Sequence, residues 1–170
     1  MQELIYNQKD IPKEQWRYGL RASAATGCGW IATYNALRLL GYRVKIEELI
    51  RYYTWQLPLI HGNGGTSFWG PWAFFTQKGF PVEMCFKREQ FDEVLDHSDV
   101  AILFYRWHKK HKLGAHFVAL QKNGDSITGY NTFSNSTGPD NWGDSIDGFM
   151  KKHHFFGGVL IGIRKKGTVM

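Results

Sequence analysis

The stretch TGCGWIATYNALRLLG, residues 26–41, joins a turn of small residues directly to an amphipathic helix. A helix over 28–40 is predicted by the spacing of the side chains on one half-buried face, namely Ile31, Ala32, Asn35, Leu39 and Leu40. Gly41 is typical of a helix C-terminus. Cys28 is therefore expected at the helix N-terminus, where the helix dipole lowers the pKa of a thiol. Such a cysteine is a candidate nucleophile, although free cysteine is also often a small buried hydrophobe.

Two further segments carry residues that a thiol nucleophile needs. GAHFVAL, residues 114–120, places His116 on an apolar strand, and ITGYNTF, residues 127–133, places Asn131 at the end of the next strand. In the order Cys, His, Asn, these side chains are a nucleophile, a general base and a group that orients the base. Each has a structural alternative, because a histidine on an apolar strand is often a core residue and an asparagine after a strand often forms a turn.

The other elements follow from hydrophobic periodicity and turn residues. We expect helices at 46–55, 71–79, 88–99 and 145–154, and strands at 81–86, 100–107, 115–121, 126–133 and 155–166. Loops are expected at 61–72, 108–114 and 134–144, and the arm over residues 1–25 is expected to be irregular. Helices followed by antiparallel strands predict an α+β fold.

Composition narrows the class of protein. With 43% hydrophobic and 21% charged residues, the chain has the composition of an ordinary globular domain. Because the chain shows neither a membrane span nor a signal peptide, we expect a cytoplasmic protein with no membrane partner. The formal net charge of +6 comes from scattered basic residues, so no nucleic-acid partner is expected. Two cysteines, Cys28 and Cys85, do not make a disulfide framework.

Four features in this order resemble the papain-like cysteine peptidase superfamily, most closely the bacteriocin-leader-processing (double-glycine) peptidases and their stand-alone bacterial relatives. Residues 26–41 resemble the nucleophile helix, and Gly64–Thr66 with the helix ending in KGF resemble the segment after it. VAILFYRW and GAHFVAL resemble the strands that lead to the histidine, and GYNTF resembles the strand that ends in the third site residue. The resemblance implies one papain-like domain over 1–170, with N-terminal helices packed on a C-terminal antiparallel sheet.

The resemblance also implies an activity: a cysteine peptidase or amidase that cleaves a peptide or small amide with Cys28, His116 and Asn131, without a cofactor. Two positions depart from the family pattern. Asn131 stands where the leader peptidases usually have Asp, and Ala22 stands where the superfamily usually has the glutamine of the oxyanion hole. If a glutamine side chain completes the oxyanion hole here, it must come from another position in the sequence, such as Gln8 or Gln15. Acyl transfer through the same thioester and a non-catalytic peptide-binding module remain alternatives, and Ala22 favours the second.

No metal site is expected. His108 and His111 have a spacing that metals use, but no nearby cysteine or carboxylate completes a ligand set. The acidic residues of the 134–147 region lack the interval pattern of a calcium loop and are expected to be solvated: Asp140, Asp144 and Asp147.

The Gly-rich loop at 61–72 lacks the Gly-Lys-Ser/Thr ending of a phosphate-binding loop, so phosphate binding is not expected there. His61 in this loop is a candidate substrate contact. Trp69, Trp72 and Trp142 suit either the walls of a cleft or the core, because large rings serve both.

Overall fold

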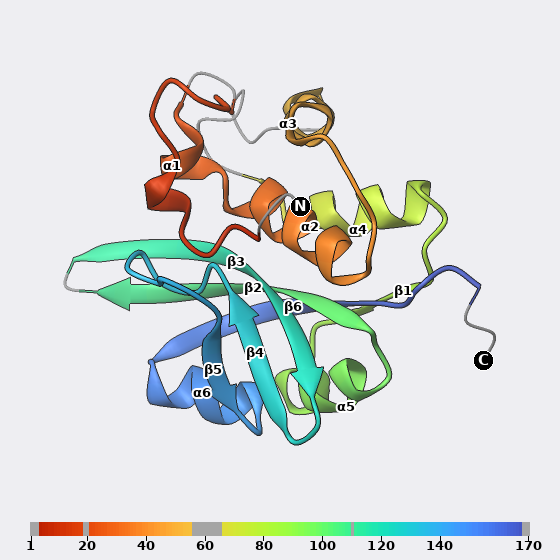
Figure 1. Cartoon of the computed structure of the whole chain (residues 1–170). Coiled ribbons are helices and arrows are strands. Elements are labelled where there is room, and N and C mark those ends of the chain that lie inside the picture. Colours follow the sequence, from red (N-terminus) through yellow and green to blue (C-terminus); the bar gives the residue numbers. More distant parts are fainter. Residues whose placement is uncertain (1–3, 19–20, 56–65, 110, 168–170) are drawn as a thin grey trace.

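The computed structural model describes residues 4–18, 21–55, 66–109 and 111–167, which form an α+β fold. Helices α2 (Cys28–Leu39), α3 (Ile46–Trp55) and α4 (Trp69–Gln77) lie on one side of a sheet, and α5 (Phe91–Asp96) and α6 (Ile146–Lys152) lie on the other (Figure 1). The short helix α1 (Ser23–Thr26) leads into α2. Of the expected 61–72 loop, residues 61–65 with His61, Gly64 and Gly65 lie outside the described residues.

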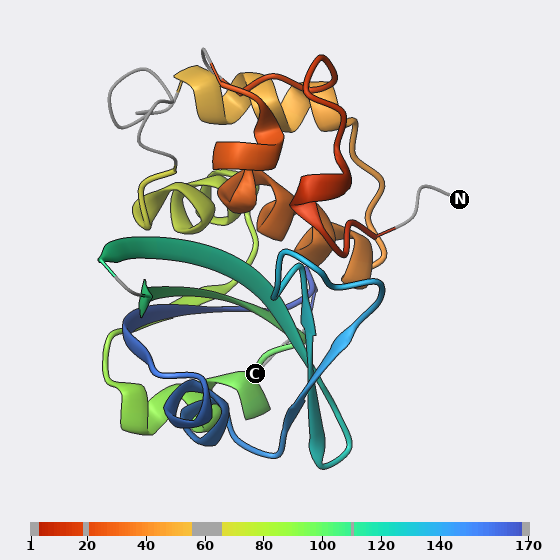
Figure 2. The ribbon, with the colours of Figure 1, turned by 90° about the vertical axis from the view of Figure 1, so that its left-hand side faces the viewer.

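The sheet contains six antiparallel strands in the order β1-β6-β2-β3-β4-β5. Their bounds are β1 (Val82–Cys85), β2 (Val100–Lys109), β3 (Lys112–Asn123), β4 (Ser126–Tyr130), β5 (Asp140–Gly143) and β6 (Phe155–Ile163). β2 and β3 form a long hairpin whose register runs from Ala101 opposite Leu120 to Lys109 opposite Lys112. Of β3, only Ala119–Asn123 pair with β4, so the first half of β3 extends beyond β4 (Figure 2).

Each face of the sheet has its own core, because alternate residues of a strand point to opposite faces. One core lies under α2, α3 and α4 and includes Trp30, Ile102 and Phe117. The other lies against α5 and α6 and includes Leu103 and Val118. In β2 and β3, which are buried on both faces, nearly every residue of the central run is apolar, as expected for strands covered on both sides.

Helix α2 forms where residues 26–41 predict it. Nine of its residues are buried, from Gly29 to Leu37, because the helix lies between the sheet and the other helices of its layer. Gly41 has a φ of 87°, and the amide of Tyr42 donates to the carbonyl of Leu37 across it. This is the left-handed C-terminal closure for which glycine is the usual residue.

The helix at 46–55 and the strands beginning at 100, 126 and 155 are confirmed, whereas other segments differ from expectation. The expected loop 108–114 belongs mostly to the ends of β2 and β3, because the two strands continue pairing beyond their apolar runs. The expected loop 134–144 contains β5, a strand with a single buried residue, which hydropathy alone does not reveal. Within the expected irregular arm, η1 (Gln8–Asp10) and α1 are helical. In the described residues, no helix has the length and apolarity of a membrane span.

Candidate active site

Cys28 is the first residue of α2, and its half-buried thiol lies against β3. Backbone N–H groups of Phe117, Gly29 and Cys28 itself point at the sulfur. Phe117 directly follows His116 in β3, so the start of the helix and the histidine segment of the strand meet at the thiol. The short turn between α1 and α2 makes this approach possible, because Gly27 is packed against the carbonyl of Ser23 and the ring of Trp30.

His116 is half-buried and lies opposite Tyr105 of β2, with a ring-centroid separation of 5.8 Å. Its Nε2 lies 2.5 Å from the backbone carbonyl oxygen of Asn131. Because a carbonyl oxygen only accepts hydrogen bonds, Nε2 must carry the proton. In the neutral ring Nδ1 is then the basic nitrogen. Between the described residues, no hydrogen bond joins the Cys28 sulfur to this ring.

Asn131 follows β4 in the left-handed region, with φ of 67°, and is buried. Asparagine tolerates this conformation better than most residues. Its side-chain oxygen accepts a hydrogen bond of 2.8 Å from the backbone N–H of Gln8. Its amide nitrogen lies 3.5 Å from the side-chain oxygen of Gln8. Asn131 therefore contacts His116 as expected from the sequence, but through its main-chain carbonyl and not through its side chain.

Gln8 is the residue that sequence reasoning could not place. Its side-chain nitrogen donates to the carbonyl of Ala24 in α1 at 3.2 Å, while its backbone N–H and side-chain oxygen contact Asn131. It thus ties the residue behind His116 to the helix that precedes Cys28. Ala22 precedes α1 at its N-terminus and contributes no side-chain hydrogen bond there.

The second wall of the site consists of Tyr18 and Thr66. The Tyr18 hydroxyl lies 3.2 Å from Oγ1 of Thr66, and both residues are buried. Thr66 packs so closely on Gly29 that a Cβ built there would lie 2.3 Å from the Thr66 hydroxyl oxygen. The glycine after Cys28 is therefore required by a close approach, and neither Tyr18 nor Thr66 carries a local signal of this role.

Electrostatics set the resting state of the site. Burial raises the pKa of the Cys28 thiol above its ordinary value, and the three N–H groups around the sulfur offset this only in part. Burial also lowers the pKa of His116, while the Asn131 carbonyl raises it and the charge of Lys9 lowers it further. Both shifts favour the neutral form, thiol for Cys28 and imidazole for His116. The expectation of a lowered thiol pKa is wrong for the free protein, because desolvation exceeds the effect of the helix N-terminus.

Two tyrosines lie near enough to the thiol for its charge to act on them. Burial is the main cause of the raised pKa values of Tyr18 and Tyr105, and the charge of an ionised Cys28 raises both further. Tyr105 is the cross-strand partner of His116, so the sulfur and the histidine share one electrostatic neighbourhood. Tyr105 also donates a hydrogen bond of 3.4 Å to the carbonyl of Thr132, the residue after Asn131.

The three candidate tryptophans lie in different places. Trp142 is buried in the α5 and α6 layer, where its ring stacks on Phe149 at 4.0 Å, so it is a core residue. Trp69 and Trp72 lie on α4 in mutual contact, and Trp69 is 48% exposed. Of the candidate acidic group, Asp147 pairs with Arg88 and Lys151. No group of three potential metal ligands occurs among the residues that the structure describes.

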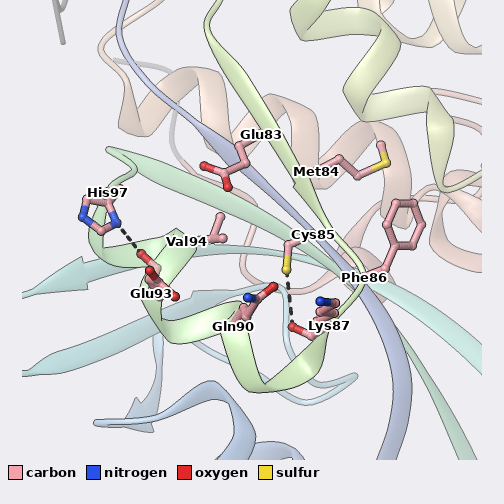
Figure 3. A pocket seen from close by; sticks show the side chains of 9 residues that line it. All are labelled: Glu83, Met84, Cys85, Phe86, Lys87, Gln90, Glu93, Val94 and His97. Atoms are coloured by element: carbon pink, nitrogen blue, oxygen red, sulfur yellow. Dashed lines mark hydrogen bonds between the residues drawn. The ribbon is translucent and has the colours of Figure 1, made fainter.

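The second cysteine of the chain, Cys85, lines a cavity away from Cys28. The cavity measures about 380 Å³ and lies between β1 and α5, where Cys85, Glu83, Glu93 and His97 line it (Figure 3). The thiol of Cys85 donates to the carbonyl of Lys87 at 3.3 Å, and the ring of His97 contacts the carbonyl of Glu93. None of Cys28, His116 and Asn131 lines this cavity, so it is separate from the candidate active site.

The arrangement at Cys28 combines a thiol at a helix N-terminus, an imidazole of fixed tautomer and several N–H donors. These are the components of nucleophilic attack on a carbonyl group. Sequence comparison identifies no family for this chain: no protein-family model matches it, and no curated protein is detectably similar to it.

Proposed function

We propose that this chain is a papain-like cysteine peptidase or amidase in which Cys28 attacks a peptide or amide carbonyl. The observation that carries the proposal is the meeting of the α2 N-terminus with β3. The backbone N–H of Phe117 points at the Cys28 sulfur. The residue before it, His116, holds its ring against the backbone carbonyl of Asn131.

The chemistry begins from neutral groups. As the sulfur attacks the carbonyl carbon, Nδ1 of His116 takes the thiol proton, and the Nε2–H donated to the Asn131 carbonyl stabilises the imidazolium. The carbonyl oxygen becomes an oxyanion near the N–H groups of the first turn of α2. The imidazolium then protonates the leaving amine, the C–N bond breaks and a thioester remains on Cys28.

The second half regenerates the site. His116 takes a proton from a water molecule that attacks the thioester carbon, and the acid product leaves while the proton returns to the sulfur. An amine in place of water would give acyl transfer by the same steps. The orienting role of Asn131 belongs to its main chain in this scheme, which is why either Asn or Asp suits the position.

A non-catalytic peptide-binding module is the second candidate. The observations that favour it are the raised pKa of the Cys28 thiol and the missing hydrogen bond, between described residues, from its sulfur to His116. The lack of a polar side chain at Ala22 points the same way. A binding module has no use for an ionised thiol.

Intact-protein mass spectrometry during reaction with activated esters and fluorogenic peptide amides tests the proposal. Wild type should gain the mass of one acyl group, and Cys28→Ser should not gain a thioester. Cys85→Ser is the matched control and should still be acylated, because Cys85 lies in the separate cavity. Adding an amine acceptor in parallel distinguishes transfer from hydrolysis.

Acylation that persists in Cys28→Ser would contradict the nucleophile assignment. Peptide binding by wild type without any acylation would favour the binding module.

A further inference from the structure

β1 is the outermost strand on its side of the sheet. Among the described strands it pairs with β6 alone, so its other edge is free. The amide of Arg164 donates to the carbonyl of Pro81, which shows that Pro81 turns its backbone towards β6. Because backbone groups alternate along an antiparallel strand, the N–H and C=O groups of Val82 and Met84 point away from β6, to the free edge. Between described residues, no loop backbone group bonds to them.

The cavity beside Cys85 lies next to this strand, on the face of the sheet that α5 covers. Cys85 lies opposite Leu160, a residue of the core against α5 and α6. Glu83, two positions earlier in β1, points to the same face. Glu93 of α5 lies across the cavity from the strand (Figure 3). All nine lining residues belong to the segment 83–97 and none to β6, so the cavity accompanies β1 and not the inner strands.

The lining of the cavity is acidic. Glu83 and Glu93 line it, and between described residues neither carboxylate forms an ion pair. Lys87 lines it as well. Residues 83–99 hold six carboxylates and two basic side chains, Lys87 and Arg88, although the whole chain has a formal net charge of +6. This segment therefore attracts a cationic ligand on a protein that is otherwise basic.

Exposed aromatic rings flank β1 on the other face of the sheet. Phe86 follows Cys85 and therefore points to the opposite face, which α4 covers. It is 55% exposed, and its ring lies 6.2 Å from the ring of Trp69 of α4, which is 48% exposed. Met84 is half-buried on this same face. The strand thus separates an acidic cavity from an exposed apolar surface.

We infer that the free edge of β1 binds an extended peptide in which basic and apolar residues alternate. The peptide adds an antiparallel strand through the outward backbone groups of β1. Its lysine or arginine side chains lie beside Glu83 and Glu93, and its apolar side chains lie beside Phe86 and Trp69. The two-residue period of a strand places these two sets on opposite faces. Binding here needs neither Cys28 nor the rest of the candidate active site.

Other occupants suit this edge less well. A nucleic acid carries negative charge, which the carboxylates of residues 83–99 repel. A second copy of the chain that paired through β1 would bring a second set of the same carboxylates to the edge, and like charges across a strand pair are destabilising. A basic peptide uses the edge, the cavity and the exposed rings together.

Binding is measured with full-length Cys28→Ser, so that cleavage does not interfere. The probes are three fluorescein-labelled eight-residue peptides: lysine alternating with valine, glutamate alternating with valine, and four lysines followed by four valines. Fluorescence anisotropy should show the alternating lysine peptide binding about tenfold more tightly than either of the others at low salt, with affinity falling as salt rises.

Charge substitutions locate the basic side chains. Glu83→Gln with Glu93→Gln should weaken binding of the alternating lysine peptide about tenfold, because both carboxylates of the cavity are neutralised. Glu14→Gln with Glu48→Gln is the matched control: it makes the same charge change at two exposed positions outside residues 83–97, and it should leave the affinity unchanged.

Two further comparisons locate the apolar side chains and the strand pairing. Phe86→Ala should weaken binding about threefold, whereas Trp55→Ala, which removes an 83% exposed ring from α3, should not change it. N-methylation of the valine amides should prevent binding, and N-methylation of the lysine amides should not. In an antiparallel pair, the residues opposite Val82 and Met84 share their face and turn their amides towards them.

Equal affinity for the alternating and block peptides, or equal effects of the two carboxylate substitutions, would overturn the inference. Equal effects of the two N-methylation patterns would also overturn it, since strand addition uses one set of amides. A dimer in sedimentation equilibrium that Glu83→Gln strengthens would instead assign the edge to a second copy of the chain.

Discussion

At Cys28, burial and three backbone N–H groups act on one sulfur in opposite directions, and burial has the larger effect. The rate of alkylation by iodoacetamide should therefore rise only above the ordinary thiol pKa of about 8.5, because the thiolate is the reactive form. The measurement is the pH dependence of alkylation followed by peptide mapping. Cys28→Ser reports the background from Cys85. A rate that has already reached its plateau at pH 7 would contradict the raised pKa.

Substitutions of Asn131 distinguish whether its main-chain carbonyl or its side chain orients His116. Asn131→Gly keeps the carbonyl that contacts Nε2 and accepts the left-handed backbone, so it should retain more activity towards a fluorogenic amide than Asn131→Ala. Both variants lose the side-chain oxygen that accepts from the Gln8 N–H, which lowers the free energy of unfolding by about 1–3 kcal/mol. The alanine variant loses about 1 kcal/mol more to backbone strain. Urea denaturation measures the stability difference. Equal and complete loss of activity in both variants would show that the side chain is the orienting group.

At the scale of the elements, the contact between α2 and Thr66 fixes where the nucleophile lies. Gly29→Ala would place a Cβ 2.3 Å from the Thr66 hydroxyl oxygen and 2.4 Å from its Cβ. Either the helix start or the segment at Thr66 must move, and we expect about 1–3 kcal/mol of destabilisation by overpacking together with slower acylation of Cys28. Thermal unfolding and acylation rate measure the two effects. Gly138→Ala, with nothing within 4 Å of the added group, is the matched control and should leave both unchanged.

For the whole molecule, His116 couples protonation to unfolding. Its pKa is lowered in the folded protein, chiefly by burial, so below the ordinary value of about 6.5 the unfolded chain binds more protons than the folded one. Stability should therefore fall as the pH drops below that value, until the folded-state pKa is reached. Urea denaturation at pH 7.5 and 5.5 should show a smaller loss for His116→Gln than for wild type. His154→Gln, on the exposed turn before β6, serves as the control, and an equal loss in all three proteins would contradict this coupling.

The sequence by itself determined the local elements and the chain order of the candidate site. The 3.6-residue pattern of 28–40 and Gly41 fix α2, and apolar runs fix β2, β3 and β6, because periodicity and turn chemistry are properties of neighbouring residues. The same reasoning selected Cys28, His116 and Asn131. It missed β5 and the paired ends of the β2–β3 hairpin, which are held by cross-strand hydrogen bonds and have little hydrophobic pattern of their own.

Tertiary structure alone decided how these residues meet. It brought Gln8 to Asn131 across 123 positions and Tyr18 to Thr66 across 48, and no local pattern encodes such distances. It reversed the expected direction of the Cys28 pKa, because desolvation depends on what covers a group and not on the helix to which it belongs.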